Sequence, residues 1–371
     1  MTGVRVAAPA EAYAVALAGL PGMGPARLRV LLDRWRPSEA WSIVASGRGV
    51  DGLGHLAPVW RAAAARVDVA RVWQAHCDAG VAVALAGTPP YPETLADDID
   101  PPVVLSWLGD VAAVDGPRVA IVGSRRCTRY GRDIAFELGH DLAAAGVRVV
   151  SGLALGVDGA AHAGALAAPA GAPPIAVVGS GLDVIYPRRH ADLWRHVAGA
   201  GVVFSEAPLG AAPEQWRFPA RNRIIAALAD VLVVVESRHQ GGSRHTVDAA
   251  AERDRVVLAV PGPVRSPTSA YPNELLHQGA GPARDALDVL VALGLAGRAQ
   301  LLALDRVAEP PPPDPVDAAV LDAIGWEPST LEEVAERSDR SLGAVAAALA
   351  RLEGGGRVAE RDGRWERAAG R

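Results

Sequence analysis

The chain has 371 residues, a net charge of −5 and 50% hydrophobic residues, enough for two or three domains with a sizeable core. It contains no lysine, which excludes Schiff-base, pyridoxal-phosphate and P-loop lysine chemistry and leaves arginine as the residue that binds phosphate and stacks on bases. The two cysteines, Cys77 and Cys127, match no metal spacing and no signal peptide is visible, so a reduced cytoplasmic protein without a membrane segment is expected.

Residues 1–80 are predicted to form a helical domain of the helix-hairpin-helix or SAM-like type. At its centre lies LAGLPGMGPARLRVLLDRW, residues 17–35, in which glycines separate two helical patterns. In a helix-hairpin-helix such glycines let the turn approach a DNA backbone and contact phosphate without reading bases. A tight turn between two packed helices explains the pattern equally well. A second helical stretch is expected over residues 59–79, and the proline-rich residues 88–109 are predicted to be irregular.

Residues 81–296 are predicted to form an α/β core with an extended Rossmann-like parallel sheet. Short apolar runs such as AIVGSR, VVSGLALGVD and AVVGSGLD each end in a glycine-rich or polar turn and alternate with helical segments. This pattern is typical of parallel strands that are buried on both faces. Because the strand ends present backbone N–H groups and helix N-termini to a ligand, a groove for phosphates is expected there.

Two of these turns are candidate anion cradles. After the first strand, Gly123 permits close backbone approach, Ser124 offers a hydroxyl and Arg125 sits where a phosphate would lie against the N-terminus of the next helix. After the fifth strand, Gly241, Gly242 and Ser243 open another helix. A plain strand-to-helix turn with surface arginines is the structural alternative for the first of them.

A third candidate is the loop that precedes the helix after the fourth strand. It combines aromatic rings, arginines and an amide, which together are what a single-strand binder needs for bases and phosphates. Alternatively, the aromatic rings pack the loop onto the sheet and some of the arginines form internal salt bridges. The candidate residues of this loop are Arg217, Phe218, Arg221, Asn222 and Arg223.

Other polar groups of the core favour structure over chemistry. Asp158 and His162 share one helical face, but without a nearby nucleophile or metal pattern they are expected to cap and pack. The sequence Gly179-Ser180-Gly181 lacks the third glycine of a dinucleotide fingerprint. No cofactor, metal or catalytic residue is predicted.

The C-terminal part divides into a linker and a small domain. Residues 297–315 are predicted to be a proline-rich linker, with a stiff run at Pro310–Pro313. Residues 316–371 show two helices, a turn, a third helix and a strand pair, the pattern of a winged helix-turn-helix. Its presumptive recognition helix, residues 342–352, carries Arg351 as its only basic residue, which argues against strong major-groove reading. The sequence of this domain is at least as consistent with a structural or protein-contact module as with a DNA reader.

VGSRR, SGLALGVDGAAHAGAL, AVVGSGLDVIYP, FPARNRIIAALAD and the GGS turn, in this order, resemble the DNA processing protein A family, also called Smf. The resemblance implies a homodimer that binds single-stranded DNA without sequence preference, protects incoming strands in natural transformation and helps load a RecA-type recombinase. It implies no reaction. It places the DNA site at Gly123, Ser124, Arg125, Phe218, Arg221, Asn222, Arg223 and Gly241–Ser243, with Arg217 as the candidate for a basic residue absent at Gln215.

Two other functional hypotheses fit parts of the sequence. Rossmann-like phosphoribohydrolases carry a glycine-rich turn followed by threonine and glutamate, and GGSRHTVD approaches this pattern with Asp248 in place of the glutamate. The third reading, a transcription regulator acting through the winged helix, is the weakest because its recognition helix is so weakly basic.

Overall fold

The computed structural model describes residues 8–50, 52–295, 314–324, 328–361 and 363–367. The chain forms two compact units, residues 1–300 and 301–371. The predicted linker at 297–315 lies almost entirely outside the described residues. No helix in the described ranges has the length and apolar composition needed to cross a membrane.

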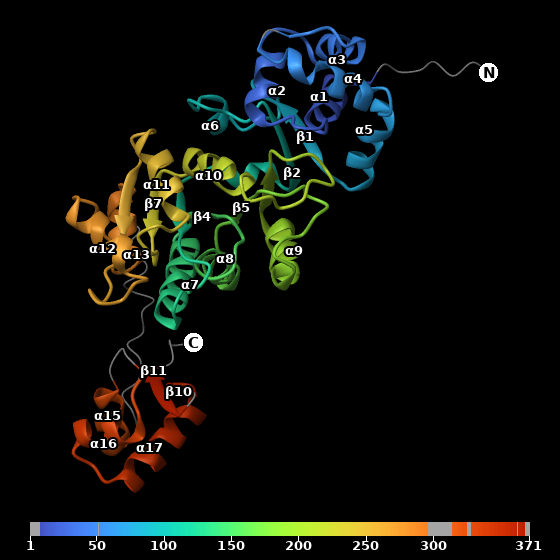
Figure 1. The fold of residues 1–371 in the computed structure, drawn as a ribbon. Coiled ribbons are helices and arrows are strands. Elements are labelled where there is room, and N and C mark those ends of the chain that lie inside the picture. Colours follow the sequence, from blue (N-terminus) through green and yellow to red (C-terminus); the bar gives the residue numbers. More distant parts are fainter. Residues whose placement is uncertain (1–7, 51, 296–313, 325–327, 362, 368–371) are drawn as a thin grey trace. The chain divides into compact units, whose positions relative to one another are not determined.

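A nine-stranded sheet forms the centre of the first unit (Figure 1), in the order β1-β2-β6-β5-β4-β3-β7-β8-β9. Strands β3 to β9 pair in parallel where they adjoin, and β2 runs antiparallel to both β1 and β6. The mixed α/β, Rossmann-like fold class is therefore confirmed. The strands are β1 (Ala82–Leu85), β2 (Val104–Gly109), β3 (Arg118–Val122), β4 (Arg148–Ser151), β5 (Ile175–Val178), β6 (Val202–Ser205), β7 (Val231–Val234), β8 (Val256–Ala259) and β9 (Gly281–Pro282).

The strand order reverses at β3. From β3 the chain proceeds through β4, β5 and β6 on one side, then returns to place β7 on the other side of β3. Val119 thus pairs with Val149 of β4 and with Val231 of β7. In open parallel sheets, a crevice for ligands lies outside the carboxyl ends of the strands at such a reversal. The loops after β3 and β7 meet there.

The prediction that residues 88–109 are irregular is wrong for half of that stretch. Residues 104–109 form β2, which lies inside the sheet between β1 and β6, and Glu93–Ala96 form the short helix α6. Pro101 and Pro102 immediately precede the strand and obscure its apolar run in the sequence. Because Val104 to Trp107 are buried, this strand extends the core rather than wrapping it.

Helices of the core cover both faces of the sheet. Alternate residues of β5 separate two hydrophobic clusters: Ile175 and Val177 pack with α10, whereas Ala176 and Val178 pack with the N-terminal helices and Trp194 of α9. The helices are α7 (Arg129–Ala144), α8 (Val157–Ala167), α9 (Ala191–Ala200), α10 (Arg217–Leu228), α11 (Ser243–Ala251), α12 (Ala270–His277) and α13 (Ala286–Ala292).

The N-terminal helices share their core with the sheet. Leu17, Leu31 and Trp60 belong to the same buried cluster as Val104 and Val203 of the strands. The predicted helix at 59–79 is in fact two helices, because the Asp68 carboxylate accepts the backbone N–H of Ala70 at 3.0 Å and starts a new one. The helices are α1 (Ala10–Ala18), α2 (Pro25–Leu32), α3 (Pro37–Ser46), α4 (Ala57–Ala64) and α5 (Val69–Asp78).

The second unit has the predicted order of three helices and a strand pair. Its elements are α15 (Pro315–Ala323), α16 (Leu331–Ser338), α17 (Leu342–Gly354), β10 (Val358–Arg361) and β11 (Arg364–Arg367). Thr330 and Glu333 form a reciprocal capping box at the start of α16. The Arg351 guanidinium of α17 lies 2.5 Å from the carboxylate of Asp317, which is itself buried. The single arginine of the presumptive recognition helix is therefore bound to α15.

Candidate nucleic-acid interface

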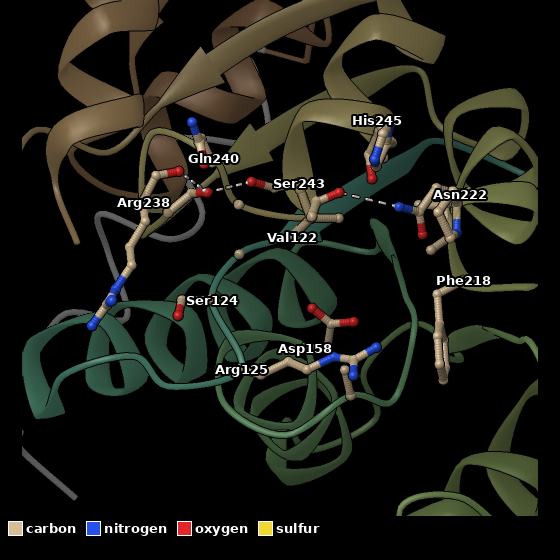
Figure 2. Close-up of a pocket in the computed structure, with 18 of the residues that line it drawn as sticks. Val122, Ser124, Arg125, Asp158, Phe218, Asn222, Arg238, Gln240, Ser243 and His245 are labelled. Carbon is tan, nitrogen blue, oxygen red and sulfur yellow. Dashed lines mark hydrogen bonds between the residues drawn. The ribbon is translucent and has the colours of Figure 1, made fainter. Parts of the chain in front are cut away.

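A groove of about 450 Å³ opens at the strand reversal, between the loops after β3 and β7 and the first turns of α10 and α11 (Figure 2). Nine of the eleven predicted site residues line it, although they come from three segments, the first and last of which lie more than 100 residues apart. They are Gly123, Ser124, Arg125, Phe218, Arg221, Asn222, Gly241, Gly242 and Ser243.

The loop after β3 lies against the end of β7. The Ser124 N–H donates to the Glu236 carbonyl at 2.6 Å, and the Ser124 hydroxyl accepts the N–H of Arg126 at 3.1 Å. A Cβ on Gly123 would lie 2.7 Å from both the Glu236 carbonyl oxygen and Val157 Cγ2. Only glycine therefore allows this approach of the two loops, which places Arg125 over the groove.

Sequence reasoning missed the side chain that holds this arrangement. Glu236 follows β7, is 2% exposed, and its carboxylate accepts the Thr128 N–H and hydroxyl, both at 2.7 Å, and the Thr268 hydroxyl at 3.1 Å. These bonds fix the start of α7 and the loop before α12 on one carboxylate. A charged residue directly after an apolar strand was the available signal.

Arg125 and Phe218 form the aromatic and cationic part of the groove. The Arg125 guanidinium lies 4.4 Å from the centre of the Phe218 ring, a cation–π contact. The Tyr186 ring lies 5.7 Å from that of Phe218 at a tilt of 40°. Figure 2 shows Arg125, Asp158 and Phe218 along one side of the groove, with Gln240, Ser243 and His245 along the other.

Arg221 and Asp158 form a buried pair beneath them. Arg221 donates to the Val177 carbonyl, and its Nη2 lies 3.8 Å from Asp158 Oδ2, which also accepts the Gly152 N–H at 3.1 Å. Burial lowers the pKa of Arg221 to about 10, with the nearby Asp158 charge opposing the shift, and burial raises the pKa of Asp158. Asp158 is thus buried and packed as expected, but it does not cap α8, because it lies inside the helix and the N-cap position is Gly156.

The turn after β7 ends in small residues, Gly241 to Ser243, and is joined to α10 by a hydrogen bond. The Ser243 hydroxyl donates to that of Ser237 at 2.6 Å, and the Asn222 amide donates to the Gly242 carbonyl at 3.4 Å. A Cβ on Gly241 would lie 2.2 Å from Ser237 Oγ, whereas one on Gly242 would meet nothing within 4 Å. The backbone of Gly242 therefore faces open space. Residues of the groove that were not predicted include Arg126, Arg238, Gln240 and His245.

Arg217 and Arg223 are not brought to this groove. Arg217 lies over Trp216, 4.5 Å from the ring centre, with its Nε 3.3 Å from Glu214. Arg223, whose side chain is 14% exposed, binds Glu206 at 2.6 Å and Asp100 at 2.8 Å. Arg223 therefore forms internal salt bridges, the alternative considered for the arginines of this loop.

Positive charge predominates in the groove. Its lining holds four arginines and one aspartate, so a polyanion is attracted rather than repelled. Among the described residues, no cluster of histidine, cysteine, aspartate or glutamate could hold a metal ion. Fold and groove together define a Rossmann-like α/β protein that presents arginines, an aromatic ring and a glycine-rich helix start to an anionic ligand.

Two protein-family models match this chain, one over the sheet-containing core and one over the C-terminal domain. Residues 82–294 match the model described as DNA recombination-mediator protein A, and residues 305–364 match the DprA winged helix domain. The chain is 40% identical over 273 residues to a putative DNA processing protein DprA of Mycobacterium tuberculosis, covering 71% of this chain and 68% of the relative. It is 35% identical over 288 residues to protein Smf of Escherichia coli, covering 75% of each.

Two solved structures are similar. DNA processing protein A of Streptococcus pneumoniae superposes with a TM-score of 0.64 and 30% identity, covering 76% of this chain and 96% of that one. DNA processing protein A of Helicobacter pylori, whose structure concerns its single-stranded DNA binding mode, gives a TM-score of 0.52 and 29% identity over 57% of this chain and 95% of that one. This chain belongs to the DNA recombination-mediator protein A family, as the sequence motifs indicated.

Membership of this family argues against the hypothesis of a phosphoribohydrolase-like enzyme. The family is defined by a mediator role in DNA recombination and not by a reaction. Asp248, the residue that stood in place of the hydrolase glutamate, is exposed on α11 and does not line the groove.

Proposed function

We propose that the protein binds single-stranded DNA in the groove at the ends of β3 and β7. The observation that carries this proposal is the Arg125 guanidinium 4.4 Å above the Phe218 ring, opposite the open Gly241–Ser243 turn. Phosphates contact Arg125 and the backbone of the turn, and a base stacks on Phe218. The proposed site comprises the nine lining residues, of which Arg221 is buried and acts through its charge.

Binding independent of sequence follows from the kinds of groups present. Every base has a face that can stack on an aromatic ring, and phosphates are identical along the strand. Arginines, backbone N–H groups and one phenylalanine therefore supply affinity without a set of base-edge contacts. We expect oligonucleotides of thymidine, cytidine and adenosine to bind with similar affinity.

We further propose that the DNA-bound protein acts as a cytoplasmic homodimer and helps a RecA-type recombinase to load, protecting incoming strands in natural transformation. The family's mediator description supports the recombinase partner. Two exposed apolar side chains four residues apart on α13 support self-association: Leu287 is 47% exposed and Val291 is 57% exposed. Light scattering of the full chain tests the dimer.

The test of DNA binding is fluorescence anisotropy of labelled oligothymidylate at several salt concentrations. Binding that weakens with salt, by a log–log slope of about −0.7 per phosphate contacted, is the expected result. Absence of salt-sensitive binding contradicts the proposal. Faster assembly of a RecA-type recombinase on DNA coated with single-strand binding protein tests the loading role in the same preparation.

A further inference from the structure

A second hollow lies beside the glycine turn between α1 and α2. It measures about 650 Å³ and is lined by Gly19–Gly24 and Arg27 on one side, and by Pro208–Ala211, Glu214, Trp216 and Arg217 on the other. The proposed DNA groove includes none of these residues. The glycine turn at residues 19–24 is the one whose sequence resembles a helix-hairpin-helix. Its role in packing α1 and α2 does not explain why its backbone is open.

Two small cavities lie between the DNA groove and the hollow, and each shares lining residues with the next. Phe218 and Arg221 line both the groove and a small cavity beside Tyr186. Gly179 and Arg221 line that cavity and another beneath α2. Trp216 and Arg217 line the cavity beneath α2 and the hollow itself. The groove, the two cavities and the hollow therefore follow one another around the first turns of α10.

The side chains of the hollow suit a nucleotide strand. Trp216 is 47% exposed, an unusual state for a tryptophan, and is held in place because its indole N–H donates to Glu214 at 2.6 Å and Arg217 covers it at 4.5 Å. Arg27 donates to the carbonyl of Gly22 at the edge of the hollow. The lining of the hollow thus holds two arginines, Arg27 and Arg217, and one carboxylate, Glu214, which pairs with Arg217 at 3.3 Å.

The backbone of the turn is open as well. Gly22 has φ +68°, a conformation that favours glycine, and a Cβ built on Gly24 meets nothing within 4 Å. A backbone without side chains lets a strand approach closely. The turn is also held at a fixed place relative to α10, since Arg29 of α2 lies 2.6 Å from Asp100, which binds Arg223 of α10 at 2.8 Å.

We propose that single-stranded DNA leaving the groove continues around the first turns of α10 and enters the hollow. There Trp216 stacks one base, and Arg27 and Arg217 contact the flanking phosphates. This second subsite rests on the proposed DNA-binding function and extends it: it makes affinity depend on strand length, because only a strand longer than the groove reaches Trp216.

The test compares two labelled oligothymidylates, of about 6 and about 20 nucleotides, on the full chain. The double variant Trp216→Ala/Arg27→Ala is expected to bind the long strand about fivefold or more weakly, and the short strand as wild type does. Its log–log salt slope for the long strand should fall by about 0.7. Trp216→Phe should restore most of the affinity, and Arg66→Ala, at an exposed arginine that does not line the hollow, should leave the affinity for both strands unchanged.

The outcomes separate the two proposals. If wild type binds neither oligonucleotide, the DNA function itself fails. If wild type binds both and the double variant matches it on the long strand, or weakens both lengths equally, the second subsite is wrong while the groove stands. A direct readout in wild type avoids any folding defect: photo-crosslinking of a long strand carrying 5-iododeoxyuridine should label Trp216, and label confined to the groove overturns the proposal.

Discussion

The Arg223 guanidinium donates to both carboxylate oxygens of Glu206, at 2.6 and 2.8 Å, and both side chains are nearly buried. Burial raises the pKa of Glu206, and the charge of Arg223 opposes that rise. A third segment joins them, because Asp100 lies 2.8 Å from Arg223 and 2.6 Å from Arg29. The helix that carries Phe218 is thereby tied to β6 and to α2.

Replacing Arg223 should therefore lower stability. Arg223→Ala leaves Glu206 buried without its partner, so the free energy of unfolding is expected to fall by about 3–5 kcal/mol in chemical denaturation. Arg195→Ala is the control: its pair with Asp192 is largely exposed, and a loss of about 0–1 kcal/mol is expected. Unchanged stability combined with lost DNA binding would show that Arg223 contacts DNA directly.

His162 makes stability depend on pH. It is fully buried, and burial, with smaller effects of His190 and Arg221, lowers its pKa from 6.5 to about 3. Between those values the unfolded state binds a proton that the folded state does not, so stability falls as the pH drops below 6.5.

His162→Leu should remove this dependence. Its loss of unfolding free energy between pH 7 and pH 5 should be smaller than that of wild type by about 2 kcal/mol. His55→Leu, at an exposed position, should leave the wild-type dependence unchanged. A pH profile of His162→Leu that parallels wild type refutes the assignment.

The packing of α7 against α8 requires Gly164. A Cβ there would lie 2.0 Å from the Phe136 carbonyl oxygen and 2.9 Å from the His140 nitrogen. Gly164→Ala should destabilise by about 1–3 kcal/mol, because two helix backbones would have to separate. Gly199→Ala in α9, where a Cβ meets nothing within 4 Å, should be neutral or stabilising by up to about 1 kcal/mol. Equal melting temperatures for the two variants would contradict this packing.

Gly242 tests how closely DNA approaches the turn. Its φ of −64° is open to any residue and a Cβ has free space, so Gly242→Ala should fold with wild-type stability. If phosphates contact this backbone, the added methyl group should weaken oligonucleotide binding, on the order of 1 kcal/mol, in anisotropy titrations. Wild-type affinity would place the strand elsewhere in the groove.

The sequence predicted the parts of the molecule that depend on local pattern. Apolar runs located the parallel strands, and the glycine and serine turns located the strand ends that the topology brings together. The motif series correctly indicated the family. Gly123 and Gly241 show why these turns could be recognised. At each position a neighbouring segment lies so close to the backbone that a Cβ would collide with it, and glycine is therefore required there and visible in the sequence.

Pairings between distant segments could not be predicted. Nothing near Arg223 in the sequence indicates that Asp100 and Glu206 will enclose it, so phosphate contact and internal salt bridge were both consistent with the pattern. Glu236 was missed for the same reason, since its partners Thr128 and Thr268 lie 108 and 32 residues away. The strand β2 was hidden by adjacent prolines, whose local signal outweighed its apolar run.

The central claim is that Arg125 and Phe218 bind the strand. The decisive measurement is the affinity of Arg125→Ala/Phe218→Ala for labelled oligothymidylate by anisotropy, beside wild type and Arg71→Ala, whose side chain is 90% exposed on α5. Loss of one stacked base and one phosphate contact predicts binding at least about tenfold weaker, with an unchanged melting temperature and with Arg71→Ala equal to wild type. Wild-type affinity in the folded double variant would contradict the account.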